Sequence, residues 1–268
     1  MDMTGKTVLI TGASRGIGAA AARAFVAQGA RVTLVARTAE AIADLAGELG
    51  DAALAVPCDI SRFWEMQTAV DATIKTFGRL DVLVNNAGAI EPIAHLAEAD
   101  PDAWGQVIDI NLKGVLFGAQ AAYPYLQKTA PGSCLLNTAS AAGIYGTPGA
   151  SVYSATKFGV RAITESLDGE WAADGIDVRS LMPSFIDTPL LDHNPNARSN
   201  EGIRQRVTDS GLEITPVDDV AAAAWAAVHG ERLHTTVGKT AKRMAFAARW
   251  LPGRVRKGTR AGGRPMGR

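Results

Sequence analysis

Short runs of apolar, β-branched residues alternate along the chain with longer Ala-rich stretches whose apolar positions recur every three or four residues. The short runs are expected to be strands and cover residues 7–10, 31–36, 52–56, 80–84, 133–138, 176–182 and, more weakly, 234–237. The longer stretches are expected to be helices and cover residues 16–28, 39–49, 61–77, 101–128, 153–173 and 217–229. Strands that are apolar on both faces need helices above and below them. The alternation therefore predicts an α/β fold with a single doubly wound parallel sheet, helices on both faces, and ligands at the carboxyl ends of the strands.

Two segments depart from this pattern. Residues 184–212 are rich in Asn, Asp, Arg and Ser and show no clear strand or helix period, so we expect a substrate lid there. Residues 232–268 hold eleven basic and no acidic residues, which leaves 16 basic against 27 acidic residues in 1–231. The overall charge of zero thus hides an acidic body and a basic tail. We predict one domain over residues 1–238 and a basic C-terminal extension over 239–268.

Composition excludes several other classes of protein. With 47% hydrophobic and 20% charged residues, the chain is suited to a buried core rather than to disorder. Cys58 and Cys134 lie in separate apolar runs, and the four histidines have no ligand spacing, so neither a disulfide framework nor a metal site is expected. No segment has the pattern of a signal peptide or a membrane span, which favours a cytoplasmic protein.

A glycine-rich turn follows the first predicted strand. Its sequence, TGASRGIG at 11–18, leads directly into a predicted helix. Gly12, Gly16 and Gly18 allow the backbone to turn tightly, to approach a diphosphate and to pack the helix on the strand, while the helix N-terminus offers free N–H groups. This strand, turn and helix together predict a nucleotide diphosphate site.

The end of the second predicted strand indicates which nucleotide binds. An acidic residue there would bind a ribose hydroxyl and repel a 2′-phosphate, but this chain has Ala36 followed by Arg37. Arg37, assisted by Arg15, is suited to hold a 2′-phosphate through charge-assisted hydrogen bonds. We therefore predict NADP(H) as the preferred cofactor, with NAD(H) possible.

Three further motifs lie after the predicted strands. They are Asn85-Asn86-Ala87-Gly88, Ser140, and Tyr153-Ser154-Ala155-Thr156-Lys157. With the glycine turn, they make the chain resemble the short-chain dehydrogenase/reductase family over about residues 4–238, in the compact single-domain branch marked by TGxxxGxG and YxxxK. The resemblance implies a Rossmann-type fold and an oxidoreductase that acts on CH–OH groups with NAD(P). It also implies a homodimer or homotetramer built through helices 101–128 and 153–173.

The resemblance also assigns roles to individual positions. It implies that the catalytic residues are Asn111, Ser140, Tyr153 and Lys157. Together with Arg37, the expected cofactor contacts are Gly12, Ser14, Arg15, Gly16, Ile17, Gly18, Asp59, Ile60, Asn86, Ala87, Gly88, Tyr153, Lys157, Pro183, Ile186 and Thr188. One position departs from the family pattern: Ser184 follows Pro183 where similar proteins have Gly. Its side chain puts in doubt any substrate carried over from a close relative.

The catalytic assignment has a chemical basis. Tyr153 and Lys157 are four residues apart, so on a helix they share one face. A neighbouring ammonium lowers the pKa of a phenol from its usual value near 10, which suits Tyr153 to act as a general acid and base. Ser140 can hydrogen-bond the substrate oxygen, and the family resemblance gives Asn111 a water of the proton relay. Each motif alone is also compatible with a surface pair or a turn residue.

The substrate is expected to be a small carbonyl compound or alcohol. Residues near the reacting carbon should come from 142–147 and 184–191, which are mostly apolar, so we expect a lipophilic ketone or secondary alcohol. Two alternatives remain: a 3-oxoacyl-thioester reductase, and a non-catalytic coenzyme-binding sensor. The sensor would be expected to lack Tyr153 or Lys157.

The basic tail contains a predicted helix over Thr240–Leu251. Met244, Ala247 and Leu251 fall on one face of it, and Lys242 and Arg249 on another. Such a helix can pack on the acidic body or a neighbouring subunit, or it can make a peripheral contact with a membrane. Nucleic acid is not expected as a partner, because no set of stacking aromatic residues accompanies the charges.

Overall fold

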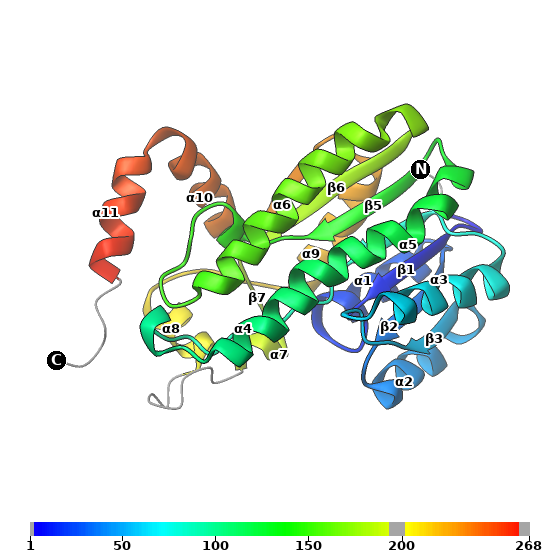
Figure 1. The fold of residues 1–268 in the computed structure, drawn as a ribbon, viewed down its shortest axis with the longest axis horizontal. Helices are drawn as coiled ribbons and strands as arrows, with labels where there is room; N and C mark the ends of the chain where they lie inside the picture. Colours follow the sequence, from blue (N-terminus) through cyan, green and yellow to red (C-terminus); the bar gives the residue numbers. More distant parts are fainter. Residues whose placement is uncertain (1–2, 193–201, 263–268) are drawn as a thin grey trace.

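The computed structural model describes residues 3–192 and 202–262, and its centre is a parallel sheet of seven strands (Figure 1). The strand order is β3-β2-β1-β4-β5-β6-β9. The strands are β1 (Thr7–Thr11), β2 (Arg31–Ala36), β3 (Ala53–Pro57), β4 (Val82–Asn85), β5 (Ser133–Thr138), β6 (Ile176–Pro183) and β9 (His234–Val237). The order reverses between β1 and β4, where a crevice forms at the carboxyl ends. The predicted doubly wound fold is confirmed.

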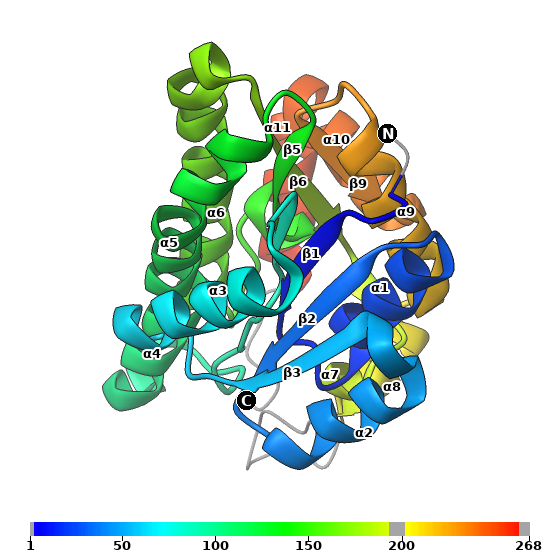
Figure 2. The same cartoon turned by 90° about the vertical axis from the view of Figure 1, so that its right-hand side faces the viewer.

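Helices cover both faces of this sheet (Figure 2). One face carries α1 (Gly16–Ala27), α2 (Ala39–Leu49) and α9 (Val217–His229), and the other carries α3 (Phe63–Phe77), α5 (Gly114–Thr129) and α6 (Ser151–Trp171). Alternate residues of β1 enter the two resulting cores: Val8 and Ile10 pack with Phe25, while Leu9 packs with Met66. The continuous apolar runs of the sequence are explained by this double coverage.

The predicted helix over 101–128 is interrupted in the structure. It consists of α4 (Pro101–Ile108), a π-helical turn over Asp109–Lys113, and α5. A π-helical turn inserts an extra residue and is frequent at functional sites. Here it carries Asn111, whose side chain is fully buried. The second long helix, α6, begins at Ser151, two residues before the predicted start, and ends at Trp171.

The predicted lid contains regular elements that its composition did not reveal. They are β7 (Phe185–Ile186), α7 (Pro189–Asp192) and α8 (Ile203–Asp209), and β7 pairs with β8 (Ile214–Thr215). Leu191, Ile203 and Val207 form a small apolar core of their own. Residues 193–201 of the predicted lid lie outside the described residues.

The basic tail forms two helices, α10 (Lys239–Trp250) and α11 (Pro252–Gly262). Both extend from one end of the molecule (Figure 1). The predicted apolar face of α10 needs correction, because Leu251 lies beyond the helix and is 37% exposed, while Ala241 is fully buried. None of the helices in the described part of the chain is long and apolar enough to cross a membrane. The boundary between residues 238 and 239 stays a prediction.

Candidate active site

The glycine turn after β1 is built so that two stretches of backbone touch. Gly12 and Gly16 have φ values of +68° and +56°, which side chains other than glycine rarely adopt. A Cβ atom added to Gly18 would lie 2.3 Å from the carbonyl oxygen of Gly12, and one added to Gly12 would lie 2.7 Å from Cα of Ala87. Gly12 and Gly18 therefore have no room for a side chain, and the backbone of the turn lines the pocket. Such a cradle fits the diphosphate of a dinucleotide.

Hydrogen bonds fix this turn to the loop after β4. The hydroxyl oxygen of Thr11 accepts hydrogen bonds from the backbone N–H groups of Asn86 at 2.9 Å and Ala87 at 3.1 Å. In return, the side-chain amide of Asn86 donates to the carbonyl of Thr11 at 3.0 Å. The two loops thus form one rigid wall at the point where the strand order reverses.

A pocket of about 400 Å³ opens along the carboxyl ends of the strands. Twelve predicted cofactor residues line it: Gly12, Ser14, Arg15, Gly16, Ile17, Arg37, Asp59, Ile60, Asn86, Ala87, Gly88 and Thr188. The other lining residues were not predicted as cofactor contacts: Ala36, Thr38, Ala41, Cys58, Ala89, Ile110, Pro189 and Leu190. Five predicted contacts do not line it: Gly18, Tyr153, Lys157, Pro183 and Ile186. Of these, Gly18 lies behind the turn, against Gly12, and Ile186 is buried in β7.

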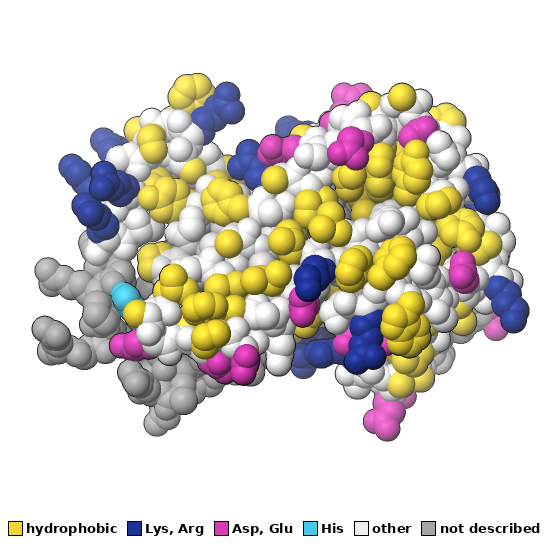
Figure 3. All heavy atoms as spheres, in the orientation of Figure 1, with side chains coloured by type: hydrophobic (Ala, Val, Ile, Leu, Met, Phe, Trp, Pro, Cys, Tyr) yellow, Lys and Arg dark blue, Asp and Glu magenta, His cyan; other side chains and the backbone are white. Residues whose placement is uncertain are grey.

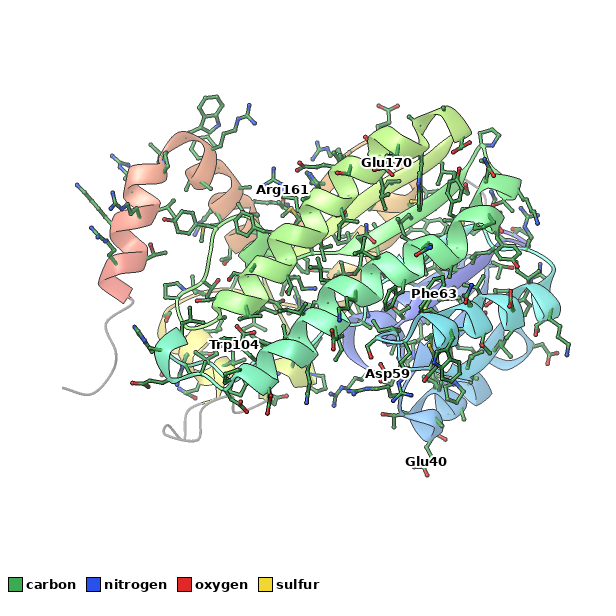
Figure 4. The ribbon with its side chains drawn as sticks, in the orientation of Figure 1. Glu40, Asp59, Phe63, Trp104, Arg161 and Glu170 are labelled. Carbon is green, nitrogen blue, oxygen red and sulfur yellow. The ribbon has the colours of Figure 1, made fainter. Side chains whose placement is uncertain are left out.

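One end of the pocket, beside the ends of β2 and β3, is cationic. Arg15 and Arg37 both line it, and no carboxylate follows β2. Asp59 precedes α3, which begins at Phe63 (Figure 4), and its Oδ1 atom accepts hydrogen bonds from the backbone and hydroxyl of Ser61. Burial opposes ionisation of Asp59, but these hydrogen bonds and the charges of Arg37 and Arg62 lower its pKa overall.

The structure brings the predicted catalytic side chains Ser140, Tyr153 and Lys157 together. Ser140 follows β5, where its Oγ atom accepts a hydrogen bond from the N–H group of Ala142 at 3.1 Å and also hydrogen-bonds with Tyr153. The Nζ atom of Lys157 lies 5.7 Å from the centroid of the Tyr153 ring and donates to the carbonyl of Thr138 at 2.8 Å. Both residues lie on α6, one turn apart, as the spacing predicted.

Asn111 connects this group to the pocket. Its side chain accepts a hydrogen bond from the N–H group of Ala89 and donates one to the carbonyl of Ala89, both at 2.8 Å. It also donates to the hydroxyl of Thr156 at 3.1 Å. A Cβ atom added to Gly88 would lie 3.5 Å from both Oδ1 of Asn111 and Nζ of Lys157. Gly88, which lines the pocket, therefore lies directly against Asn111 and Lys157. The catalytic roles of these residues remain predictions.

The titration of the pair differs from the prediction. We expected Lys157 to lower the pKa of Tyr153, but in the chain alone that pKa is raised, chiefly by burial and also by the charge of Glu91, while the hydrogen bond with Ser140 opposes the rise. Burial also lowers the pKa of Lys157 to about 8. Lys157 does lie beside the phenol, but burial decides the direction of the pKa shift of Tyr153.

Glu91 is a site residue that the sequence did not reveal. Glu91 is 4% exposed, and its carboxylate accepts hydrogen bonds from the backbone N–H groups of Val152 and Tyr153 at 3.0 Å. These groups belong to the first turn of α6, whose N-cap residue, Ala150, has no side chain able to accept them. The single signal in the sequence is a charge inside the otherwise apolar segment Ala-Ile-Glu-Pro-Ile.

Ser184, the departure from the family pattern, does not line the pocket. A Cβ atom added to Gly238 would lie 2.8 Å from Oγ of Ser184 and 2.6 Å from Oγ1 of Thr215. Gly238 therefore provides the space that the extra side chain needs. On the other side of the segment, Thr188 lies over the glycine turn, since a Cβ atom on Gly16 would meet its methyl group at 3.2 Å.

Comparison with known proteins agrees with this geometry. The profile of the family described as short chain dehydrogenase matches residues 6–199. An uncharacterized oxidoreductase of Staphylococcus saprophyticus is 39% identical over 81% of this chain and 87% of its own, and one of Staphylococcus aureus is 36% identical over 73% and 85%. The crystal structure of a 3-ketoacyl-(acyl-carrier-protein) reductase from Brucella melitensis, complexed with NADH, has 32% identity and a TM-score of 0.80 over 88% of this chain and 98% of that chain. The chain is therefore an oxidoreductase that belongs to the short-chain dehydrogenase family.

Proposed function

We propose that this protein is an NADP(H)-dependent oxidoreductase that interconverts a lipophilic ketone and its secondary alcohol, with Tyr153 as general acid and base. The observation that carries the proposal is the convergence of Ser140, Tyr153 and Lys157 beside Gly88, at the end of the nucleotide pocket. A hydroxyl, a phenol and an amine at one point are suited to orient a carbonyl oxygen and to exchange a proton with it.

The residues present fit a nicotinamide dinucleotide. The glycine turn would hold its diphosphate, and Arg37 with Arg15 would hold a 2′-phosphate. When bound, the cofactor supplies a hydride to the carbonyl carbon or accepts one from the alcohol. The Brucella reductase was crystallised with NADH, so NAD(H) is the second candidate. The absence of a carboxylate after β2 favours NADP(H).

The side chains around the reacting carbon have separate tasks. In reduction, the hydroxyl of Tyr153 donates its proton to the substrate oxygen, and in oxidation the phenolate accepts it. Ser140, already hydrogen-bonded to Tyr153, orients the same oxygen. Lys157, held by the carbonyl of Thr138, stabilises the phenolate when it is charged.

The lid region favours an apolar substrate, but only some of its apolar side chains face the pocket. Leu191 is buried with Ile203 and Val207 and packs the lid itself. Leu190 lines the pocket and is 44% exposed. A 3-oxoacyl-thioester reductase is the second candidate function, favoured by the likeness to the Brucella enzyme.

We also propose that the protein is a cytoplasmic homodimer or homotetramer. The long helices α5 and α6 support this assembly, because Leu116 on α5 is 44% exposed and Phe158 on α6 is 40% exposed. Apolar side chains of this size on neighbouring helices are suited to pack against a second copy.

The test is an assay of NADPH and NADH consumption with steroid, aromatic, aliphatic and acyl-thioester ketones, run on the native chain and on Tyr153→Phe. We expect turnover with NADPH and an apolar ketone, and loss of turnover in Tyr153→Phe with NADPH binding retained. Turnover that survives in Tyr153→Phe would refute the role of the phenol. NADPH binding without turnover on any ketone or alcohol would favour the non-catalytic sensor, and preference for acyl thioesters would favour the second candidate.

A further inference from the structure

The tail helix α10 uses only one of its faces to pack on the body. Ala241 is fully buried, and the helix contacts β9 and the turn Ala141–Gly143, which directly follows Ser140. This packing fixes the orientation of α10 and so decides which residues face outward.

The outward face of α10 combines cationic and aromatic side chains. Apart from Lys239, which pairs with Glu213, its exposed residues are Lys242, Arg243, Phe246, Arg249 and Trp250. At 3.6 residues per turn these five positions fall within an arc of about 120°. Phe246 is 61% exposed and Trp250 is 63% exposed, and the guanidinium of Arg249 lies 5.3 Å from the centroid of the Trp250 ring. Two large aromatic side chains thus lie exposed among three positive charges.

The positive charge continues along α11. Arg254, Arg256, Lys257 and Arg260 are exposed there, and the sequence has no acidic residue after Glu231. Figure 3 shows Lys and Arg side chains gathered over this end of the molecule. Among the described residues, Lys239 is the only cation of the tail in an ion pair, with Glu213 at 3.9 Å. Apart from Lys239, the described cations of the tail therefore make no ion pair with the acidic body of their own chain.

We propose that the outward face of α10, supported by the cations of α11, docks on a membrane surface that carries anionic lipids. The Lys and Arg side chains would bind lipid phosphates, and Phe246 and Trp250 would insert at the boundary between headgroups and acyl chains. A nucleic acid would satisfy the charges, but two aromatic residues on a convex helix do not form a stacking groove. The acidic body of a second copy would also satisfy the charges, and the test below separates this outcome by measuring self-association.

Docking on this face would bring the membrane close to the catalytic turn. The turn Ala141–Gly143 contacts α10, and in the sequence it directly follows Ser140. A lipid-soluble ketone could then reach the site directly from the bilayer surface; this consequence rests on the proposed function, whereas docking itself does not. The experiment therefore measures binding, which is independent of turnover.

The test is co-sedimentation of the full chain with vesicles of phosphatidylcholine alone and of phosphatidylcholine with phosphatidylglycerol. We expect binding to the anionic vesicles only, and release near 1 M salt, where the screening length is about 3 Å. The triple variant Lys242→Gln, Arg243→Gln, Arg249→Gln should bind about a hundredfold more weakly, at about fivefold for each charge. The double variant Phe246→Ser, Trp250→Ser should bind the anionic vesicles about tenfold more weakly, or weaker still. All five side chains are exposed, and far-ultraviolet circular dichroism of each variant would show that α10 still folds.

A matched control is Trp64→Ser. Trp64 is 61% exposed, but it lies on α3, away from the tail. We expect this variant to bind vesicles as the native chain does, and we expect tryptophan fluorescence to shift to the blue on binding unless Trp250 is replaced by Phe. The proposal is overturned by absence of binding at low salt, by equal binding to neutral vesicles, or by equal losses in Trp64→Ser and the tail variants. It is also overturned if the triple variant instead loses self-association or DNA binding while vesicles are never bound.

Discussion

Replacing Glu91 separates its two effects, one on the stability of α6 and one on the proton affinity of Tyr153. In Glu91→Ala, the N–H groups of Val152 and Tyr153 lose their acceptor at a partly buried helix end. In Glu91→Gln, an amide oxygen remains to accept a hydrogen bond, but the negative charge is lost. The comparison of the two variants thus distinguishes hydrogen bonding from charge.

The size of the stability effect follows from the contacts. Loss of an N-terminal cap costs about 0.5–2 kcal/mol, and loss of a carboxylate near a partly buried helix N-terminus costs up to about 2 kcal/mol more. We therefore expect Glu91→Ala to lower the free energy of unfolding by about 2–3 kcal/mol. At about 2–4 °C for each kcal/mol in a chain of this size, Tm should fall by about 4–12 °C. Glu91→Gln should lose about half as much.

The catalytic effect should appear in the pH profile. The charge of Glu91 raises the pKa of Tyr153, so Glu91→Gln should lower that pKa and shift the rise of alcohol oxidation to lower pH. Calorimetry gives Tm, and initial rates between pH 6 and pH 11 give the profile.

A suitable control is Glu170→Gln, which removes the same charge near the other end of α6 (Figure 4). Glu170 is exposed, so this control should change neither the melting temperature nor the profile appreciably. An unchanged Tm in Glu91→Ala, or a profile that stays in place or moves to higher pH in Glu91→Gln, would refute the reasoning.

Three further predictions concern the pocket, the catalytic pair and the lid. Arg37→Gln should raise the KM for NADPH about 10- to 100-fold, because a hydrogen bond to a charged group contributes about 1.5–3 kcal/mol. The KM for NADH should stay unchanged, and equal effects on both cofactors would contradict the assigned role of Arg37. Lys157→Met should abolish turnover yet raise the free energy of unfolding at pH 7 by up to about 3 kcal/mol, because the folded pKa is about 8 against 10.5 in the unfolded chain. That gain should shrink between pH 8 and pH 10.5, and denaturation at several pH values that shows a loss instead would refute it. Gly238→Ala should lower the free energy of unfolding by about 1–3 kcal/mol, since the φ of Gly238 is +87° and the added Cβ would meet two hydroxyl groups. Adding Ser184→Gly to this variant should restore part of the lost Tm.

Local periodicity was sufficient to predict the sheet but not the interruptions of its helices. Each strand of the large sheet was located to within one or two residues, because buried parallel strands are continuous apolar runs. The π-helical turn over Asp109–Lys113 was missed, since it is held by the bonds of Asn111 to Ala89, 22 residues away, and apolar positions continue through it. The strands β7 and β8 have two residues each, too few to show an alternation.

The candidate site was predictable wherever its residues lie in compact motifs. The glycine turn and the pair on α6 are such motifs, and the structure places them where their spacing indicated. Glu91 was missed because it is 61 residues from Val152, the nearer of the two N–H groups that it caps. The accommodation of Ser184 was missed for the same reason, since it depends on Gly238, which follows β9 and is distant in the sequence.

The direction of the pKa shift of Tyr153 depends on burial as well as on the neighbouring charges. Helical spacing correctly predicts that an amine lies beside the phenol, and the nearby cation alone would lower the phenol's pKa. However, the helix that brings the pair together also buries it, and burial disfavours both the phenolate and the ammonium. At neutral pH the chain alone therefore holds a protonated phenol and a lysine that is still mostly charged, which is the state that reduction requires. As pH rises through about 8, Lys157 loses the charge that would stabilise the phenolate, so oxidation depends on additional positive charge reaching the site.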